Sequence, residues 1–394
     1  MSIDLDLYPH QRDSLAKMKN GCILAGDVGT GKSRVAVAYY CKVEADADVF
    51  VITTAKKRET LDWQKEFARA GIGRHLNATV GGALTVDSWN QIEKYEDVVG
   101  AFFIFDESRL GGSGPWSKSF LKIAKNNRWI LLSATPADVW LDYCSVFIAN
   151  GFYKNRTEFK REHVVYNSYA KFPKVERYVG VGKLIRQRNA IIVPMPYSRV
   201  TTRHEEYITV DYDKELYKKV VDERWNIFKE RPLRDAGELF SAMRRLVNSS
   251  PSRMDAVTKL IQSNPKLIVF YGFDYELDTL RLLANFTTVG ELNGHRHDPL
   301  PCGDSWVYLV QYAAGCEGWD CTETDTMVFY SLPYSYRMYY QAHGRIDRLN
   351  TEYRELYYYN LVSNSVIDRV IVDCLRKKKD FNESAFIKGQ LSTN

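Results

Sequence analysis

The sequence predicts an α/β protein of two lobes, each with a parallel β-sheet flanked by helices. Short apolar segments alternate with helical patterns in two successive sets, which is typical of right-handed crossovers between parallel strands. The run Ala101 to Phe105 is continuously apolar, as expected of a strand buried on both faces of a sheet. At 394 residues the chain is too long for one compact core. We therefore expect lobe 1 at residues 1–200, and a helical connection with lobe 2 at 201–394.

The elements follow in order. The first set of predicted strands is Cys22 to Ala25, Val49 to Thr53, Ala83 to Val86, Ala101 to Phe105 and Trp129 to Leu132. The second set is Leu267 to Tyr271, Thr287 to Leu292, Trp306 to Val310, Met327 to Ser331 and Glu355 to Leu361. Helical patterns include Ser33 to Cys41, Arg58 to Ala70, Asp274 to Asn285 and Arg337 to Arg348, and a mostly helical stretch covers Asp213 to Ser263.

A phosphate-binding loop is predicted directly after the first strand. The segment Gly26 to Ser33 reads GDVGTGKS and fits the pattern Gly-x-x-x-x-Gly-Lys-Ser. Its glycines let backbone N–H groups approach phosphates, its lysine reaches the β and γ oxygens, and its serine can bind Mg²⁺. The candidate nucleotide-binding residues here are Gly26, Gly29, Thr30, Gly31, Lys32 and Ser33.

Two carboxylates follow the fourth strand. Asp106 and Glu107 stand at the carboxyl end of the apolar run Ala101 to Phe105. In that position Asp106 can hold the Mg²⁺ shell, while Glu107 can orient and deprotonate an attacking water. An acidic turn after a strand is the simpler reading of an isolated Asp-Glu pair, and the preceding phosphate loop favours the catalytic one.

Composition is that of a large soluble protein. Hydrophobic residues make up 45% of the chain, and no apolar run approaches the ~18 residues that cross a bilayer. The chain opens without the pattern of a secretory leader, so we expect an intracellular protein. The seven cysteines are scattered without a Cys-x-x-Cys pair, which predicts reduced thiols rather than a zinc site.

The formal charge of +5 is modest, but its distribution is uneven. From Gly151 to Thr201 basic residues exceed acidic ones by eight, with aromatic residues interleaved. Such a stretch could track a phosphate backbone, with Lys171, Lys174 and Arg177 as candidate contacts. A solvated basic face over a small core is an equally good reading.

Taken together, the motifs resemble those of superfamily 2 helicases and, more narrowly, of Swi/Snf-like DNA translocases, from Leu7 to about Lys379. Tyr8-Pro9-His10-Gln11 looks like the adenine-recognition element. Segments similar to motifs Ia, Ib and III are Val51 to Ala55, Leu84 to Ser88 and Ser133 to Pro136. Ala314 to Asp320 resembles motif V, and Gln341, Gly344, Arg345 and Arg348 fit motif VI. The chain departs from the family pattern at two places. The acidic motif continues with Ser108-Arg109, where the family usually has a small residue and then histidine, and motif V ends in Trp319-Asp320 rather than Leu-Asn.

The resemblance implies two RecA-like lobes with a nucleotide cleft between them, and ATP with Mg²⁺ as ligands. It assigns Gln11, Gly318 and Asp320 to nucleotide binding. It assigns Gln341, Arg345 and Arg348 to catalysis, with the arginines reaching the γ-phosphate. Thr53, Lys56 and Ser88 would contact the nucleic-acid backbone, and Ser133 and Thr135 would couple nucleotide state to lobe closure.

The expected function is an ATP-dependent motor on duplex DNA, independent of base sequence. We also expect a monomer without membrane association, of compact bacterial or phage type, in the cytoplasm of a bacterium or an infected host. A strand-separating or RNA-directed helicase shares the same motifs. A nucleic-acid or protein-binding scaffold with a vestigial nucleotide site is the alternative outside the enzymes.

Overall fold

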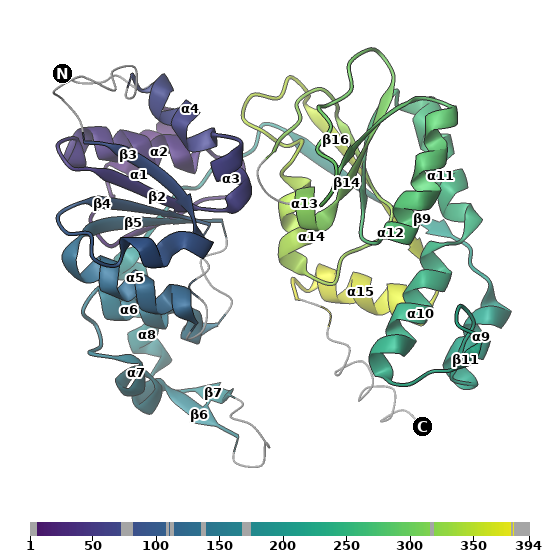
Figure 1. Ribbon diagram of the computed structural model, residues 1–394, viewed down its shortest axis with the longest axis horizontal. Coiled ribbons are helices and arrows are strands. Elements are labelled where there is room, and N and C mark those ends of the chain that lie inside the picture. Colours follow the sequence, from purple (N-terminus) through teal and green to yellow (C-terminus); the bar gives the residue numbers. More distant parts are fainter. Residues whose placement is uncertain are drawn as a thin grey trace. The chain divides into compact units, whose positions relative to one another are not determined.

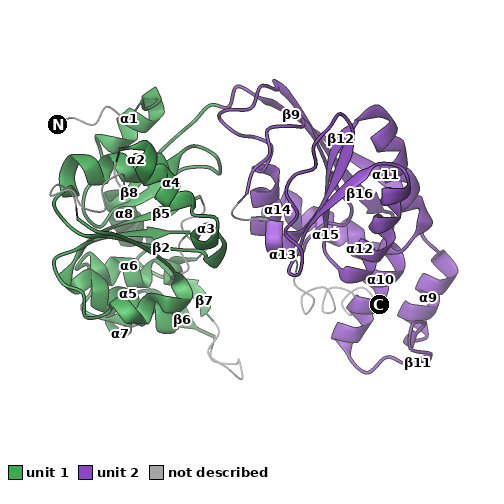
Figure 2. Cartoon of the chain, turned by 45° about the horizontal axis from the view of Figure 1, so that its top comes forward, with its two compact units in different colours: residues 1–198 green, residues 199–394 purple. Residues whose placement is uncertain are grey.

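The computed structural model describes residues 6–71, 82–107, 110, 114–134, 139–167, 175–315, 319–379 and 381. The chain divides into two compact units, Met1–Ser198 and Arg199–Asn394, coloured separately in Figure 2. Each unit contains a six-stranded sheet whose strands all run parallel. The predicted fold class, parallel sheets flanked by helices in two lobes, is confirmed.

Unit 1 has the strand order β3-β2-β4-β5-β1-β8. Its strands are β1 (Ile23–Ala25), β2 (Val49–Thr53), β3 (Leu84–Ser88), β4 (Phe102–Asp106), β5 (Arg128–Ser133) and β8 (Ile192–Pro194). Five of them were predicted within two residues at each end. The edge strand β8 was missed because it has three residues and ends in proline, which gives too short a pattern to recognise.

Helices cover both faces of this sheet (Figure 1). They are α1 (Pro9–Leu15), α2 (Lys32–Tyr39), α3 (Ala55–Glu59), α4 (Asp62–Arg69), α5 (Pro115–Asn126), α6 (Cys144–Ala149), α7 (Arg156–His163) and α8 (Val181–Ile191). Along β4, Phe103 and Phe105 join the core with α5 and α6, whereas Phe102 and Ile104 join the core with α2 and α4. Burial on both faces explains why this strand has a continuous rather than an alternating apolar sequence.

A small antiparallel arm, β6 (Val164–Tyr166) with β7 (Val175–Tyr178), extends from the end of α7. The arm and α7 both fall within the basic stretch from Gly151 to Thr201. Two of its interleaved aromatic residues, Tyr153 and Phe159, are buried in the unit 1 core. These two rings therefore serve packing and are closed to a polymer.

Unit 2 has the strand order β13-β14-β12-β15-β16-β9. Its strands are β9 (Thr202–Val210), β12 (Lys266–Tyr271), β13 (Thr288–Leu292), β14 (Trp306–Gln311), β15 (Thr326–Phe329) and β16 (Glu355–Ser363). A short pair, β10 (Trp225–Asn226) with β11 (Arg231–Pro232), lies apart from this sheet. The tyrosine-rich β16 alternates between buried and more exposed residues over its first half, with Leu356 and Tyr358 buried in the core.

The helices of unit 2 also flank its sheet (Figure 1). They are α9 (Lys214–Asp222), α10 (Ala236–Asn248), α11 (Pro251–Ser263), α12 (Asp274–Leu280), α13 (Tyr312–Gly315), α14 (Tyr336–His343) and α15 (Val366–Arg376). One core lies against α10, α14 and α15, and the other lies against α11 and α12. The predicted helical stretch from Asp213 to Ser263 is broken at Ser249-Ser250, between α10 and α11.

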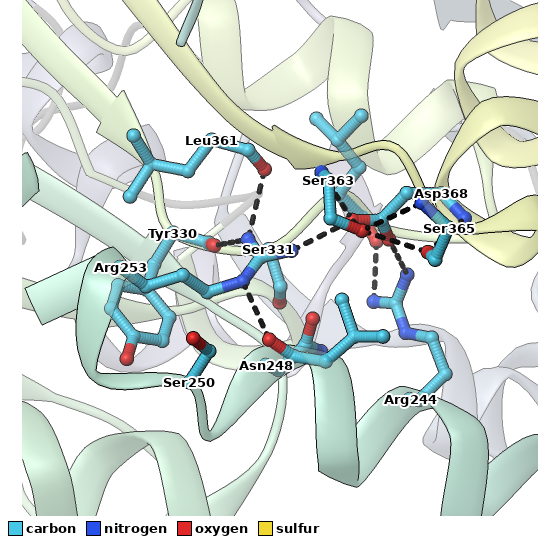
Figure 3. Close-up of polar contacts among 12 residues, drawn as sticks. Arg244, Asn248, Ser250, Arg253, Tyr330, Ser331, Leu361, Ser363, Ser365 and Asp368 are labelled. Carbon is cyan, nitrogen blue, oxygen red and sulfur yellow. Dashed lines mark hydrogen bonds and ion pairs between the residues drawn. The ribbon is translucent and has the colours of Figure 1, made fainter. Parts of the chain in front are cut away.

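An ionic network inside unit 2 joins α11 to α15 and to the ends of two strands (Figure 3). Arg253 is fully buried and donates to the main-chain oxygens of Val247, Tyr330 and Leu361. Its Nη2 lies 2.7 Å from Oδ2 of Asp368, which also accepts hydrogen bonds from the backbone N–H and hydroxyl of Ser363. Arg253 thus ties α11 to the end of α10, to the residue after β15 and to β16.

Three predicted helices differ from the structure. The pattern Arg58 to Ala70 is two helices, α3 and α4, because Leu61 between them adopts φ of 57°. Asp274 to Asn285 is α12 followed by a 3₁₀ helix. The helix predicted at Arg337 to Arg348 is α14, which ends at His343. Both motif VI arginines therefore lie in the loop beyond it.

Candidate active site

Five segments of the candidate site meet at one edge of the unit 1 sheet. Because its strands are parallel, their carboxyl ends share an edge, where ligands usually bind in open α/β sheets. The strands end there with Thr53 (β2), Ser88 (β3), Asp106 (β4) and Ser133 (β5), and the loop beginning at Gly26 follows β1. The backbone N–H of Gly26 donates to the carbonyl of Ser133 at 3.3 Å, which ties two of these segments together.

The loop conformation explains its glycines. Gly29 and Gly31 have φ of 82° and 83°, a region that residues with a Cβ rarely adopt. A Cβ at Gly26 would lie 2.9 Å from Cε of Met195 and 3.0 Å from the Thr30 hydroxyl. The loop ends at Gly31, which immediately precedes α2, so Lys32 and Ser33 lie in the first turn of an eight-residue helix. Backbone N–H groups at such a terminus favour an anion.

Lys32 lies over the loop, with its ammonium donating to the carbonyls of Gly26 at 2.7 Å and Asp27 at 2.8 Å. Burial lowers the pKa of Lys32 to about 8, and the carboxylates of Glu107, Asp106 and Asp27 oppose that shift. The charges of Glu107 and Asp106, at the end of β4, thus favour the protonated, positively charged form of Lys32.

Asp106 is nearly fully buried, and three donors converge on its Oδ2. They are the Thr53 hydroxyl at 2.8 Å, the Lys57 ammonium at 2.9 Å and the Trp63 indole N–H at 3.0 Å. The Trp89 indole also donates to the Asp106 carbonyl at 2.9 Å. Charge-assisted and buried hydrogen bonds of this kind hold a carboxylate in one orientation.

Glu107 follows in an unusual backbone conformation. Its φ is 54°, which costs a residue other than glycine of order 1–3 kcal/mol. Its Oε1 lies 3.5 Å from Nζ of Lys57, and its side chain is 15% exposed. A strained, partly exposed glutamate beside a phosphate loop is consistent with a functional constraint at this position.

Gln11, predicted to read adenine, is buried beneath the phosphate loop. Its Nε2 donates to the Thr30 carbonyl at 3.0 Å, and its Oε1 accepts from the backbone N–H of Tyr8 at 3.0 Å. His10 also approaches the Thr30 carbonyl, at 3.3 Å. Gln11 is thus joined to the loop, while its predicted contact with a base stays a prediction.

In unit 2, the motif V and motif VI residues contact one another. The Trp319 carbonyl accepts from Nη1 of Arg345 at 2.6 Å and from Nη2 of Arg348 at 3.1 Å. Nε of Arg348 lies 3.5 Å from the Asp320 carboxylate, and the buried Gln341 accepts from Nε of Arg345 through its carbonyl at 3.1 Å. Burial and the neighbouring Arg345 lower the pKa of Arg348 to about 10, so it stays charged at neutral pH.

Asp347, between those arginines, anchors the loop to the start of unit 2. Its carboxylate accepts from Arg199 and Arg203 on Oδ2 at 2.6 and 2.7 Å, and from Thr201 on Oδ1 at 2.8 Å. The Asp347 side chain is almost fully buried. Asp347, for which the sequence predicted no role, thereby fixes the loop that carries Arg345 and Arg348.

The residues predicted to contact nucleic acid differ in how far they are buried. Thr53 is fully buried and donates to Asp106, which suits the carboxylate site better than contact with a polymer. Ser88 is buried, Lys56 is partly exposed on α3, and Arg177 is exposed on β7. Lys171, Lys174, Thr135 and Gly318, together with Ser108 and Arg109, lie outside the described residues.

Sequence reasoning missed Lys57 and Trp89. The signal for Lys57 was a run of three basic residues, Lys56 to Arg58, immediately after a buried strand. The run alone does not say which side chain turns inward, because that depends on where α3 begins. Thr54 caps α3 by accepting from the backbone N–H of Lys57, and this start directs Lys57 toward Asp106.

The residues at this edge suit Mg²⁺. Among the described residues no group of three or more His, Cys, Asp and Glu side chains could hold a metal ion alone. Mg²⁺ at nucleotide sites takes one or two protein oxygens and completes its shell with water and phosphates. The Ser33 hydroxyl and the Asp106 carboxylate are hard oxygen donors of the kind it takes.

No helix in the described part of the chain combines the length and apolar composition needed to cross a membrane.

Comparison with known proteins gives a distant likeness. No family model and no curated protein matches the chain. Among solved structures, the chain is similar to the SWI2/SNF2 ATPase core of Sulfolobus solfataricus, solved in complex with dsDNA. The match covers 96% of this chain and 92% of that chain, at 15% sequence identity and a TM-score of 0.43. A likeness this distant assigns no role to any residue of this chain.

Proposed function

We propose that the chain is an ATP hydrolase whose turnover depends on nucleic acid, with duplex DNA as the preferred polymer. One observation carries the proposal. The phosphate loop, which follows β1, and the carboxylates of Asp106 and Glu107 at the end of β4 lie at the same edge of the unit 1 sheet. A loop that binds phosphates beside a carboxylate that can activate water is the minimum needed for phosphoanhydride hydrolysis.

The residues of unit 1 would divide the chemistry among them. The N–H groups from Gly29 to Ser33 and the Lys32 ammonium would bind the β and γ phosphates. Mg²⁺, held by Ser33 and Asp106, would neutralise the charge that develops on the phosphate oxygens. Glu107 would orient the attacking water and accept its proton. Thr53 and Trp63 would keep Asp106 in its orientation.

Unit 2 would contribute Arg345 and Arg348. Both are charged and held by the Trp319 carbonyl, and Asp347 anchors their loop. Guanidinium groups fixed in this way can stabilise the charge of a phosphoryl-transfer transition state without reorganising. This role was predicted from motif VI, and it is supported by the fixed positions of the two arginines.

The polymer is proposed from the motif pattern and from the basic residues Lys56, partly exposed on α3, and Arg177, exposed on β7. Binding through the phosphate backbone would be independent of base sequence and would weaken steeply with salt. Coupling of hydrolysis to movement along DNA would make the chain a translocase.

ATP hydrolysis measured alone and with single-stranded DNA, duplex DNA or RNA tests the proposal. We expect the greatest stimulation with duplex of any sequence. Stimulation by RNA alone would instead favour an RNA-directed helicase, since the 2′-hydroxyl distinguishes the two polymers. The absence of hydrolysis under all four conditions would favour a scaffold with a vestigial site.

A further inference from the structure

Lys57 binds the two carboxylates of the candidate site from α3. Its ammonium lies 2.9 Å from Oδ2 of Asp106 and 3.5 Å from Oε1 of Glu107. It therefore neutralises part of the charge of the two groups that the proposed chemistry uses, one for Mg²⁺ and the other for water.

Orientation of Asp106 does not need this lysine. The hydroxyl of Thr53 and the indole of Trp63 already donate to the same Oδ2, and both side chains are buried at 0% and 1% exposure. What Lys57 adds to the two neutral donors is a positive charge. That charge opposes binding of a divalent cation at Asp106 and makes Glu107 a poorer proton acceptor.

Lys57 is also the donor that can leave. Its side chain is 19% exposed, and a lysine chain has many rotamers by which its ammonium can move to solvent. It lies on the short helix α3 between Lys56 and Arg58, so an anion bound at this helix would compete with the carboxylates for the same ammonium.

The same helix is connected to the end of β3. Nη1 of Arg58 lies 3.1 Å from Oδ1 of Asp87, and the backbone N–H of Ser88 donates to that oxygen at 2.7 Å. Lys56, a predicted backbone-binding residue that is partly exposed, lies on α3, so α3 joins the proposed polymer surface to the carboxylates within one unit.

We propose that Lys57 is an inhibitory counter-ion of Asp106 and Glu107, and that nucleic-acid phosphate bound at α3 draws it away, which releases both carboxylates for hydrolysis. The proposal rests on the ATPase function proposed above and supplies its regulation. Stimulation by a polymer of any sequence would follow, because only a backbone phosphate is needed.

The test compares the full-length protein with Lys57→Met, Lys57→Arg and the control Lys65→Met, whose side chain is exposed on α4. Without polymer, Lys57→Met should hydrolyse ATP about tenfold faster than the unmodified protein, a barrier change of about 1.4 kcal/mol. Its rate with saturating duplex should stay within about threefold. Lys57→Arg keeps the charge and should keep a low basal rate, as should the control.

A second measurement separates this inference from the ATPase proposal. The thermal unfolding midpoint, measured without nucleotide as MgCl₂ is raised, should respond at lower Mg²⁺ concentration in Lys57→Met than in the unmodified protein. Equal loss of basal and stimulated rates in Lys57→Met, with an unchanged Mg²⁺ response, would make Lys57 an activating residue and overturn the inference. If the unmodified protein hydrolyses no ATP, the proposed function fails, while the Mg²⁺ response still decides whether Lys57 opposes the cation.

Discussion

At the scale of residues, the side chains that hold the orientation of Asp106 differ from the side chain that partly neutralises its charge. Buried neutral donors, Thr53 and Trp63, fix the carboxylate, and the partly exposed Lys57 modulates it. Glu107 comes next in the chain. Its left-handed backbone conformation breaks the extended geometry of the buried strand that ends at Asp106. Two adjacent carboxylates thereby acquire different environments, as distinct roles at one site require.

Arg348 gives a residue-scale prediction. Arg348→Ala should lower the ATP hydrolysis rate by ~10³ to 10⁵, because a fixed guanidinium acts mainly on the transition state. ATP affinity, measured with a fluorescent analogue, should change little. The control is Arg354→Ala, an exposed arginine just before β16. A rate reduced no more than in the control, or a loss confined to ATP affinity, would remove Arg348 from this role.

At the scale of elements, the sequence predicted ten of the twelve strands in the two sheets, because interior strands are apolar on both faces. The missed β9 is an edge strand whose sequence, TRHEEYITV, is rich in polar residues. It pairs with β16 over nine residues, and this pairing leaves no pattern in the local sequence.

The phosphate loop and the acidic pair were predicted from local motifs. Lys57 and Asp347 were not, because their roles arise only where distant segments meet.

The ionic network of Arg253 and Asp368 gives an element-scale prediction. Removing Arg253 takes away the nearer of the two cations beside the buried Asp368, since Arg244 lies 3.9 Å from its carboxylate, so Arg253→Met should destabilise unit 2 by about 3–5 kcal/mol. Hydrogen exchange of α11 and β16 in the full chain measures the change. Arg369→Met, exposed on α15, is the control and should stay within about 0.5 kcal/mol. Protection of α11 equal to that in the control would show that Arg253 contributes little stability.

At the scale of the whole molecule, each unit has its own sheet and its own pair of cores. The cores of unit 1 draw on residues up to Met195, and those of unit 2 begin at Ile208. The phosphate loop and the carboxylates belong to unit 1, whereas both motif VI arginines belong to unit 2. Binding and hydrolysis should therefore be separable by dividing the chain.

A fragment of residues 1–198 should fold cooperatively and bind ATP, because it holds the entire loop and both of its cores. It should not turn ATP over at the full-length rate, since it lacks Arg345 and Arg348. Circular dichroism during thermal unfolding, nucleotide titration and steady-state hydrolysis check the three statements. Hydrolysis by the fragment at the full-length rate would contradict a role for unit 2.

The central claim is that the chain hydrolyses ATP with Glu107 as the base. The most direct measurement is steady-state hydrolysis and ATP binding by Glu107→Gln with saturating duplex DNA, beside Glu93→Gln, an exposed glutamate, as control. We predict that Glu107→Gln binds ATP as the unmodified protein does and loses hydrolysis by about 10²- to 10⁴-fold, while the control keeps both. Hydrolysis by Glu107→Gln at the rate of the control would contradict the claim.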